Sequence, residues 1–293
     1  MEMNYKLKNL LKQASKSNYA LGHFNFSTLE ILRAVVNACV FLKSPIFVGT
    51  SEGEAEAVGY KQAAYLVKAW REETGFPVFL NADHHKNFDN AKKAIDAGYD
   101  SVQIDETSMS FEENIEISRK VVGYAKGVNP EISVEGGLGY IRGSSKIIKE
   151  KMELREEDMT TPEQARKFAD ETGVDRLAIV FGNMHGVSLA GNPRLDIERL
   201  KKVHNEIPDM PLTLHGGSGI NDDDIRATLG WGMSNIHVNT EIRVSYTDAL
   251  RKKLNDDREE TTPYKYMESA VLAAQKTIEM KLKLFGAVGI VTS

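Results

Sequence analysis

Cysteine is almost absent from this 293-residue sequence, because Cys39 is the only one, and no disulfide bond can form within the chain. Cys39 lies in an apolar helical stretch, so we interpret it as a small buried hydrophobic residue rather than a reactive thiol. A chain without disulfides suits a reducing compartment, and we expect it in the cytoplasm. No apolar run is long enough to span a bilayer, and the N-terminus lacks the features of a secretory signal, so no membrane partner is expected.

Positive charge is not in excess either, since the formal net charge is −5 at pH 7 and the basic residues form no block. Nucleic acids select positive surfaces, so a nucleic-acid partner is not expected. Hydrophobic residues make up 41% of the sequence, which is enough for a large core. The length permits one or two domains, and α/β barrels of this size are commonly a single domain.

Short apolar runs alternate with stretches of helical periodicity along the chain. The runs predict eight strands, at residues 19–23, 45–49, 77–81, 101–105, 131–135, 176–181, 211–214 and 235–238. Strands joined by helical crossovers form parallel sheets, and eight such units can close into a barrel. We therefore predict an α/β fold, a single-domain (β/α)8 TIM barrel spanning residues 1–293. An open doubly wound sheet is the alternative, but no GxGxxG motif follows the first strand.

Two helix starts carry recognisable signals. Thr28 is a candidate N-cap ahead of residues 29–42, and Thr161 precedes Pro162, which has no N–H group to lose in the first helical turn. The connection at residues 140–160 is long and charged, and it predicts a mobile loop beside the active site. The residues after Pro263 predict an extra C-terminal helix.

Histidines follow several of the predicted strands, and functional side chains of such barrels gather where the strands end. His84 and His85 come directly after Asp83 at the end of the third strand, while His185 follows the sixth and His215 the seventh. Three neutral imidazoles with an open fourth position are typical of a catalytic zinc site. We therefore predict a metal site at this rim, although each segment taken alone is also compatible with an ordinary polar loop.

The segments HGGSG at 215–219 and VNTE at 238–241 follow the seventh and eighth strands. Barrels often bind phosphate at this place, through backbone N–H groups and the start of a short helix. A glycine-rich segment by itself is as typical of a turn, but the neighbouring metal site favours a small phosphorylated substrate. Two more histidines belong to the first and last predicted strands: His23 ends the first strand, and His237 lies near the end of the eighth.

Eight stretches occur in the order, and at nearly the spacing, that one enzyme family shows: YALGHFNFSTLE, SPIFVGTSEG, NADHHKNFDNAKKAIDAGYDSVQID, FEENIE, SVEGGLG, ETGVDRLAIVFGNMHG, LTLHGGSGI and VNTE. Over nearly its whole length the chain resembles the class II, metal-dependent ketose-bisphosphate aldolases, which act on fructose or tagatose bisphosphate. The resemblance implies an aldehyde-lyase that joins or separates dihydroxyacetone phosphate and an aldehyde such as glyceraldehyde 3-phosphate. It also implies one Zn2+ per chain, and we expect a homodimer or homotetramer.

The resemblance also implies a role for individual residues. His84, His185 and His215 would be the zinc ligands, Asp83 would be the acid/base that handles the proton of the C4 hydroxyl, and His85 would line the site. Ser51 would face the aldehyde half of the substrate. The dihydroxyacetone phosphate half would be bound by Gly186, Gly216, Gly217, Ser218, His237, Val238, Asn239 and Thr240.

The metal route is the one that the residues favour. Cleavage between C3 and C4 leaves a carbanion next to a carbonyl group, which a divalent cation can stabilise while a carboxylate takes the hydroxyl proton. A lysine Schiff base is the other chemical solution. No lysine ends a predicted strand, since the nearest, Lys86, follows the histidine pair, and we therefore reject the Schiff-base route.

Two departures from the family pattern concern the metal and proton exchange. Gly137 stands where a second glutamate is usual, which leaves Asp105 and Glu135 as the ligands of a weak second metal site. The loop acid that exchanges a proton at C1 is missing near Ser145.

Two further departures concern the substrate. His237 replaces an asparagine that is expected to contact the donor, and Tyr264 replaces the arginine that contacts the distal phosphate, with Lys265 beside it. Two other functions therefore stay open: a barrel that binds metal and phosphate without aldol activity, as a sensor or partner subunit, and a metal-dependent sugar-phosphate epimerase or isomerase. Retention of Asp83 with the three histidines favours the aldolase, because a scaffold has no physical need for them.

Overall fold

The computed structural model describes residues 5–105 and 109–292, and its centre is a closed barrel of parallel strands. Neighbours around the barrel follow the order β1-β10-β9-β7-β5-β4-β3-β2, and each neighbouring pair is parallel. The predicted (β/α)8 barrel is confirmed, and the open doubly wound sheet is excluded because the sheet closes. The barrel strands are β1 (Leu21–Asn25), β2 (Ile46–Thr50), β3 (Val78–His85), β4 (Ser101–Ile104), β5 (Ser133–Leu138), β7 (Arg176–Ile179), β9 (Leu212–Leu214) and β10 (Met233–Val238).

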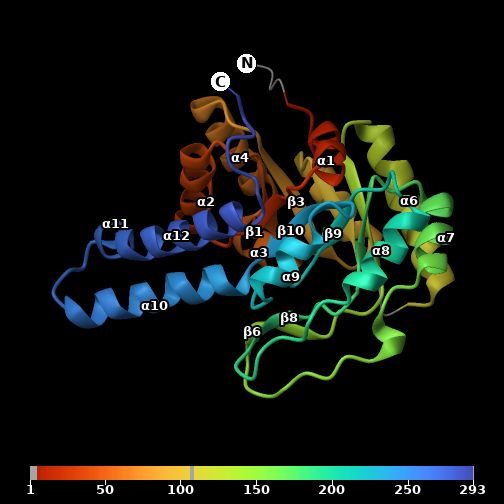
Figure 1. Ribbon diagram of the computed structural model, residues 1–293. Helices are drawn as coiled ribbons and strands as arrows, with labels where there is room; N and C mark the ends of the chain where they lie inside the picture. The colour runs from red at the N-terminus through yellow and green to blue at the C-terminus, as the bar shows by residue number, and fades with distance from the viewer. Residues whose placement is uncertain (1–4, 106–108, 293) are drawn as a thin grey trace.

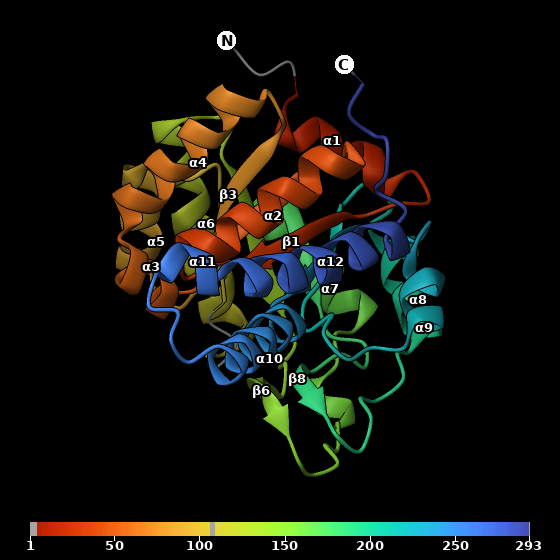
Figure 2. The ribbon, with the colours of Figure 1, turned by 90° about the vertical axis from the view of Figure 1, so that its left-hand side faces the viewer.

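Helices alternate with the strands and surround the barrel (Figures 1 and 2). They are α1 (Leu7–Ser15), α2 (Leu29–Leu42), α3 (Glu52–Val58), α4 (Tyr60–Thr74), α5 (Phe88–Ala97), α6 (Phe111–Val128), α7 (Pro162–Thr172), α8 (Ile197–Glu206), α9 (Asp222–Thr228), α10 (Thr240–Asp256), α11 (Pro263–Tyr266) and α12 (Glu268–Leu284). Within residues 5–105 and 109–292, none of these helices combines the length and the apolar character needed to cross a membrane.

The predicted helix starts are confirmed. The Thr28 hydroxyl accepts a hydrogen bond from the amide of the third residue of α2 at 3.3 Å, and α2 spans residues 29–42 as predicted. Thr161 caps α7 through a capping box with Gln164, and Pro162 is the first residue of that helix. Both caps satisfy amide groups that have no partner inside the helix.

The barrel strands are buried on both faces, by the surrounding helices and by side chains that fill the interior. Strand β1 ends at Asn25, two residues beyond the predicted end, so the prediction for His23 was wrong. Asn25 occupies the rim, whereas His23 lies inside the barrel and is fully buried.

The connection at residues 140–160 is more structured than expected. It contains β6 (Gly143–Ile148) and the short 3-10 helix η1 (Glu156–Asp158). Strand β6 pairs in parallel with β8 (His185–Ser188), and this two-stranded sheet lies at the end of the molecule opposite the chain termini (Figure 1). The sheet fixes the start of β8, and so the position of His185.

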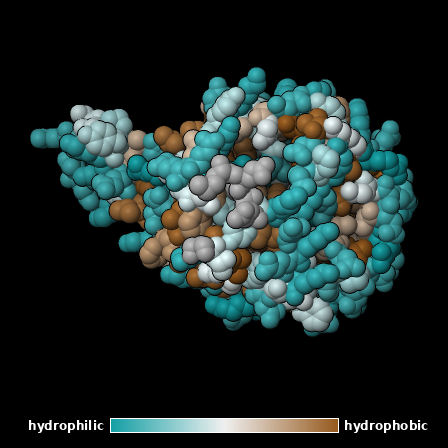
Figure 3. Space-filling model, turned by 90° about the horizontal axis from the view of Figure 1, so that it is seen from above, coloured by the Kyte–Doolittle hydropathy of each residue, from teal (hydrophilic) through white to brown (hydrophobic). Residues whose placement is uncertain are grey.

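Helices α10 and α12 pack side by side and form an arm that extends beyond the barrel (Figures 1 and 3). The expected C-terminal helix after Pro263 is confirmed, as the short α11 followed by α12. Hydrophilic side chains cover most of the outer end of the arm as seen in Figure 3.

Candidate active site

A small cavity opens where the barrel strands end, and it gathers side chains from strands that are distant in the sequence. Histidines, one carboxylate, amide groups and glycine-rich loops meet there, as the carboxyl ends of parallel barrel strands allow. The lining residues are Asn25, Asp83, His84, Ser145, His185, Gly186, His215, Gly216, Ser218, His237, Asn239 and Thr240.

An irregularity at the end of β3 lets two neighbouring residues face the same cavity. In a regular strand, Asp83 and His84 would point to opposite sides of the sheet. The pairing of β3 with β4 shifts register between Ala82 and His85, and His84 has a φ of 50°, in the left-handed region that residues other than glycine seldom occupy. The amide of His84 donates to the Gln103 side chain at 2.9 Å, which holds this conformation.

His85 takes a different direction, which corrects the expectation that it lines the site. Its ring is buried, lies edge-on to Tyr60, and has Nε2 3.2 Å from the tyrosine oxygen. His85 is not among the residues that line the cavity.

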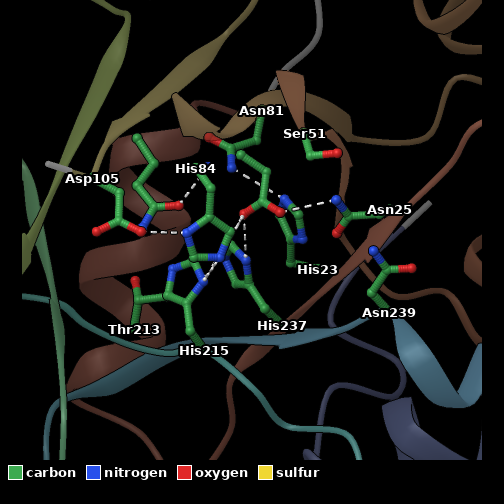
Figure 4. Close-up of polar contacts among 12 residues, drawn as sticks. His23, Asn25, Ser51, Asn81, His84, Asp105, Thr213, His215, His237 and Asn239 are labelled. Carbon is green, nitrogen blue, oxygen red and sulfur yellow. Dashed lines mark hydrogen bonds and ion pairs between the residues drawn. The ribbon is translucent and has the colours of Figure 1, made fainter. Parts of the chain in front are cut away.

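Two imidazoles, those of His84 and His215, face each other in the cavity (Figure 4). Nδ1 of His84 bonds the Asp105 carboxylate at 2.5 Å, and Nε2 of His215 bonds the Glu135 carboxylate at 2.7 Å. These contacts leave Nε2 of His84 and Nδ1 of His215 directed at each other, 3.1 Å apart. Oδ1 of Asp83 lies 4.0 Å from each of these two nitrogens.

This geometry suits a tetrahedral metal ion. Two nitrogens at about 2.0–2.1 Å from zinc lie roughly 3.3 Å apart, close to the separation of the two facing nitrogens. Carboxylates bonded to the far nitrogens are the usual outer partners of metal-binding histidines. Asp105 and Glu135, which were predicted as ligands of a second metal site, each form a hydrogen bond with a histidine ring instead. Glu135 also pairs with the buried Arg176.

His185 is the third predicted ligand, and it lies next to His84 rather than between the other two. Its ring centroid is 4.8 Å from that of His84 and 6.5 Å from that of His215. Among the described residues, the tight group of possible ligand atoms around His84 and His215 contains Asp83 and not His185.

The charges at the site are uneven. Burial lowers the pKa of His185, and the neighbouring His84 and His215 lower it further, to about 3, so its ring is neutral. Burial acts to lower the pKa of His84 too, but the carboxylates of Asp83 and Asp105 outweigh it and raise this pKa to about 9. Burial acts to raise the pKa of Asp83, yet the adjacent His84 holds it well below its usual range. The His84 imidazole thus lies where a positive charge is stabilised.

Glycines bring backbone close to the cavity on the side of β8 and β9. Gly186 has a φ of 93° and Gly216 a φ of 69°, and a Cβ atom at Gly216 would lie 2.1 Å from the Met184 carbonyl oxygen. Ser218 also lines the cavity. The Gly217 amide already donates to the His237 carbonyl at 2.8 Å, so this predicted phosphate donor has an intramolecular partner.

The remaining predicted substrate residues divide in two. Asn239 and Thr240, at the start of α10, line the cavity, as does His237. Val238 is fully buried in the barrel core, and its side chain is not part of the cavity lining. Ser51 caps α3, and its hydroxyl donates to Glu54 at 2.9 Å.

Sequence reasoning missed Asn25 and Glu54. The Asn25 amide, labelled in Figure 4, donates to the Asp83 carboxylate at 2.9 Å. It also donates to the Glu54 carboxylate at 2.8 Å. Glu54 also accepts from the Asn239 amide at 3.3 Å. The signal for Asn25 was a polar residue at the end of the first strand, which was obscured because that strand was predicted to end at residue 23.

The residues that depart from the family pattern differ in their distance from the cavity. Gly137 lies beside Asp105, because a Cβ atom there would be 3.0 Å from its Oδ1. Ser145, on β6, lines the cavity. Tyr264 is 70% exposed on α11, and the adjacent Lys265 pairs with Glu260 at 3.5 Å, so neither lines this cavity.

The fold and the polar cavity identify the class of this protein. It is a (β/α)8 barrel enzyme whose polar groups meet at the carboxyl ends of the strands. A sequence model of the family described as Fructose-bisphosphate aldolase class-II matches residues 5–290. The chain belongs to the class II fructose-bisphosphate aldolase family, and it is an aldehyde-lyase.

Curated relatives and solved structures agree with this assignment. Proteins named fructose-bisphosphate aldolase from Staphylococcus epidermidis and Geobacillus stearothermophilus are 33% and 34% identical to the chain. The first alignment covers 96% of each of the two sequences, and the second covers 97% of each. The crystal structure of the YdjI aldolase from Escherichia coli K12 is similar, with a TM-score of 0.81 and 26% identity over 98% of both chains. A putative fructose-1,6-biphosphate aldolase from Coccidioides immitis shares the fold, with a TM-score of 0.86 at 23% identity over 98% of both chains.

Proposed function

We propose that the chain is a zinc-dependent aldolase that cleaves a ketose bisphosphate into dihydroxyacetone phosphate and an aldehyde such as glyceraldehyde 3-phosphate, and that also catalyses the reverse condensation. The observation that carries the proposal is the pair of facing nitrogens of His84 and His215, 3.1 Å apart, with Asp83 beside them. The names of the relatives support a ketose bisphosphate as the substrate.

His84, His185 and His215 would hold one Zn2+ per chain. A divalent cation bound there would act as a Lewis acid on the oxygens next to the carbon that gains negative charge. Imidazole ligands favour zinc over magnesium. Asp105 and Glu135 would orient the rings of His84 and His215, and a second metal ion stays doubtful because both carboxylates already bond imidazoles.

Asp83 would take the proton of the C4 hydroxyl during cleavage and return one to the aldehyde oxygen during condensation. Its carboxylate lines the cavity and is held ionised beside His84 and His215. A positioned carboxylate of this kind is what general base catalysis requires.

The phosphate of the donor would bind at Gly186, Gly216, Gly217 and Ser218 and at the start of α10. The glycines let the backbone approach the ligand, and the first amides of a helix attract an anion. His237, Asn239 and Thr240 would complete this half of the site, with Val238 contributing only through its backbone. Ser51 would face the aldehyde half.

Zinc content and activity test the proposal together. The purified protein should contain about one zinc per chain, and removal of the metal with a chelator should abolish cleavage of fructose 1,6-bisphosphate. Asp83→Ala should keep its zinc and lose roughly a hundred- to ten-thousand-fold in kcat. Full activity in metal-free protein would refute the metal route, and bound zinc without cleavage would favour an epimerase, an isomerase or a binding protein.

We also propose a cytoplasmic homodimer or homotetramer that acts on a small phosphorylated sugar, with residues 1–293 forming one domain. Exposed apolar side chains on the neighbouring helices α2 and α12, with Phe41 at 68% and Met280 at 61% exposed, support an assembly. Sedimentation of the purified protein would decide between a monomer and an oligomer.

A further inference from the structure

His23 and His237 form a stacked pair inside the barrel (Figure 4), and His237 contacts Asp83. They are partners in the register of β1 and β10, which places their rings side by side. The ring centroids are 3.6 Å apart and the ring planes differ by 3°. Burial lowers the pKa of His23 to about 4, so its ring is neutral and can stack without charge repulsion.

The outer ring of the pair is tied to Asp83. Nε2 of His237 lies 2.7 Å from the Asn235 side-chain oxygen, and the Asn235 amide donates to the Leu21 carbonyl at 2.9 Å. The oxygen of this amide holds the His237 ring at Nε2. Nδ1 of the same ring lies at hydrogen-bond distance, 3.1 Å, from Oδ1 of Asp83.

Asp83 is held at its second oxygen as well, by the Asn25 amide at 2.9 Å. With Oδ1 bonded to His237 and Oδ2 bonded to Asn25, the plane of the carboxylate is fixed. Proton transfer depends strongly on such placement, because an error of about 1 Å can reduce a rate by roughly a hundredfold.

The inner ring, His23, fits against a glycine. A Cβ atom at Gly49 would lie 2.2 Å from Cε1 of His23 and 2.3 Å from its Nε2, closer than any side chain permits. Nε2 of His23 also lies 3.1 Å from the Asn81 amide. The column Gly49, His23, His237 and Asp83 is therefore packed without spare room, and a shift at one end is transmitted to the other.

A shared metal ion does not explain the stack. Nitrogen lone pairs of imidazole point along the ring plane, and an ion bound by both rings must lie close to both planes. The planes of His23 and His237 are parallel and stacked, so their lone pairs cannot converge on one ion. The two rings make a packing contact.

We infer that the stacked pair of His23 and His237 positions the carboxylate of Asp83, with His23 acting through His237 and without contact with the substrate. The inference rests on the proposed role of Asp83 as the acid/base. It assigns a function to His23, which lies outside the cavity lining.

The test uses zinc-loaded full-length protein and cleavage of fructose 1,6-bisphosphate. His23→Ala should reduce kcat by about ten- to a hundredfold, while KM and the zinc content stay within about threefold of the wild-type values. Gly49→Ala should reduce kcat similarly, because the new methyl group displaces the His23 ring. In the double variant the methyl group enters the space that the ring has left, so its kcat should equal that of His23→Ala rather than show multiplied losses.

A matched control and clear contrary results complete the design. His204→Ala removes a histidine from α8, outside the barrel, and should leave kcat unchanged. If His23→Ala does not fold, His23→Asn provides the same comparison with a smaller polar group. An unchanged kcat in the His23 variant, multiplied losses in the double variant, or loss of zinc from His23→Ala would each overturn the inference. Wild-type protein that binds zinc but cleaves no fructose 1,6-bisphosphate would overturn the proposed function, and the inference that rests on it would fall with it.

Discussion

The buried ion pair between Arg176 and Glu135 offers a quantitative test of how the barrel interior is held together. Both side chains are fully buried. The Arg176 guanidinium also donates to the Ser133 hydroxyl at 2.8 Å and to the Asn81 side-chain oxygen at 3.1 Å, and it lies 5.0 Å from the centre of the Phe47 ring. Arg176→Met would fill a similar volume and remove the charge and all three donated bonds.

The expected loss follows from the charge that stays behind. Burial acts to raise the pKa of Glu135, but Arg176 and the hydrogen bond with His215 hold it well below the usual range, so the carboxylate is ionised. Removing one partner of a buried pair typically reduces the free energy of unfolding by about 3–5 kcal/mol. Thr213 and His215 still bond the carboxylate, at 2.9 and 2.7 Å, so we expect the lower part of that range.

Urea unfolding followed by circular dichroism would measure the effect. Arg119→Met is the matched control, because its pair with Glu171 is 57% and 41% exposed, and such pairs contribute about 0–1 kcal/mol. Adding Glu135→Gln to Arg176→Met should recover part of the loss, since the unpaired charge disappears. A loss below about 1 kcal/mol for Arg176→Met, or no recovery in the double variant, would refute the reasoning.

Three further predictions concern the site and the core. Asp105→Ala should weaken zinc binding about ten- to a hundredfold in a chelator competition, because the His84 ring loses its outer partner; unchanged affinity would contradict this orienting role. Gly216→Ala should raise KM for fructose 1,6-bisphosphate by at least about tenfold, since its positive φ alone makes a side chain unfavourable by about 1–2 kcal/mol; the control Gly53→Ala meets no atom within 4 Å and should leave KM unchanged. Cys39 is buried and its pKa is raised by burial, so the native protein should not react with a thiol reagent at pH 8, and unfolding in urea should expose one thiol per chain; rapid labelling of the folded protein would show that the core opens.

The sequence by itself determined the barrel and the composition of its rim. Alternation of apolar runs with helical periods is a local property, and so are the caps at Thr28 and Thr161, which the structure confirms. Because the carboxyl ends of parallel strands share one rim, the order of the motifs was enough to bring His84, His185 and His215 to the same end of the barrel.

Tertiary structure decided which atoms face each other. The direction of the His84 side chain depends on a register shift in the pairing of β3 with β4. The sequence of either strand alone does not indicate this shift. The position of His185 depends on β6, which forms only by pairing with β8 across a long connection.

The stacked pair that contacts Asp83 has the same origin. His23 and His237 are 214 residues apart in the sequence, and they meet because β1 and β10 close the barrel. A strand end misplaced by two residues was enough to assign His23 to the rim instead of the interior. Local patterns therefore predicted the fold and the kinds of residue at the site, whereas closure of the barrel and the register of its strands decided their contacts.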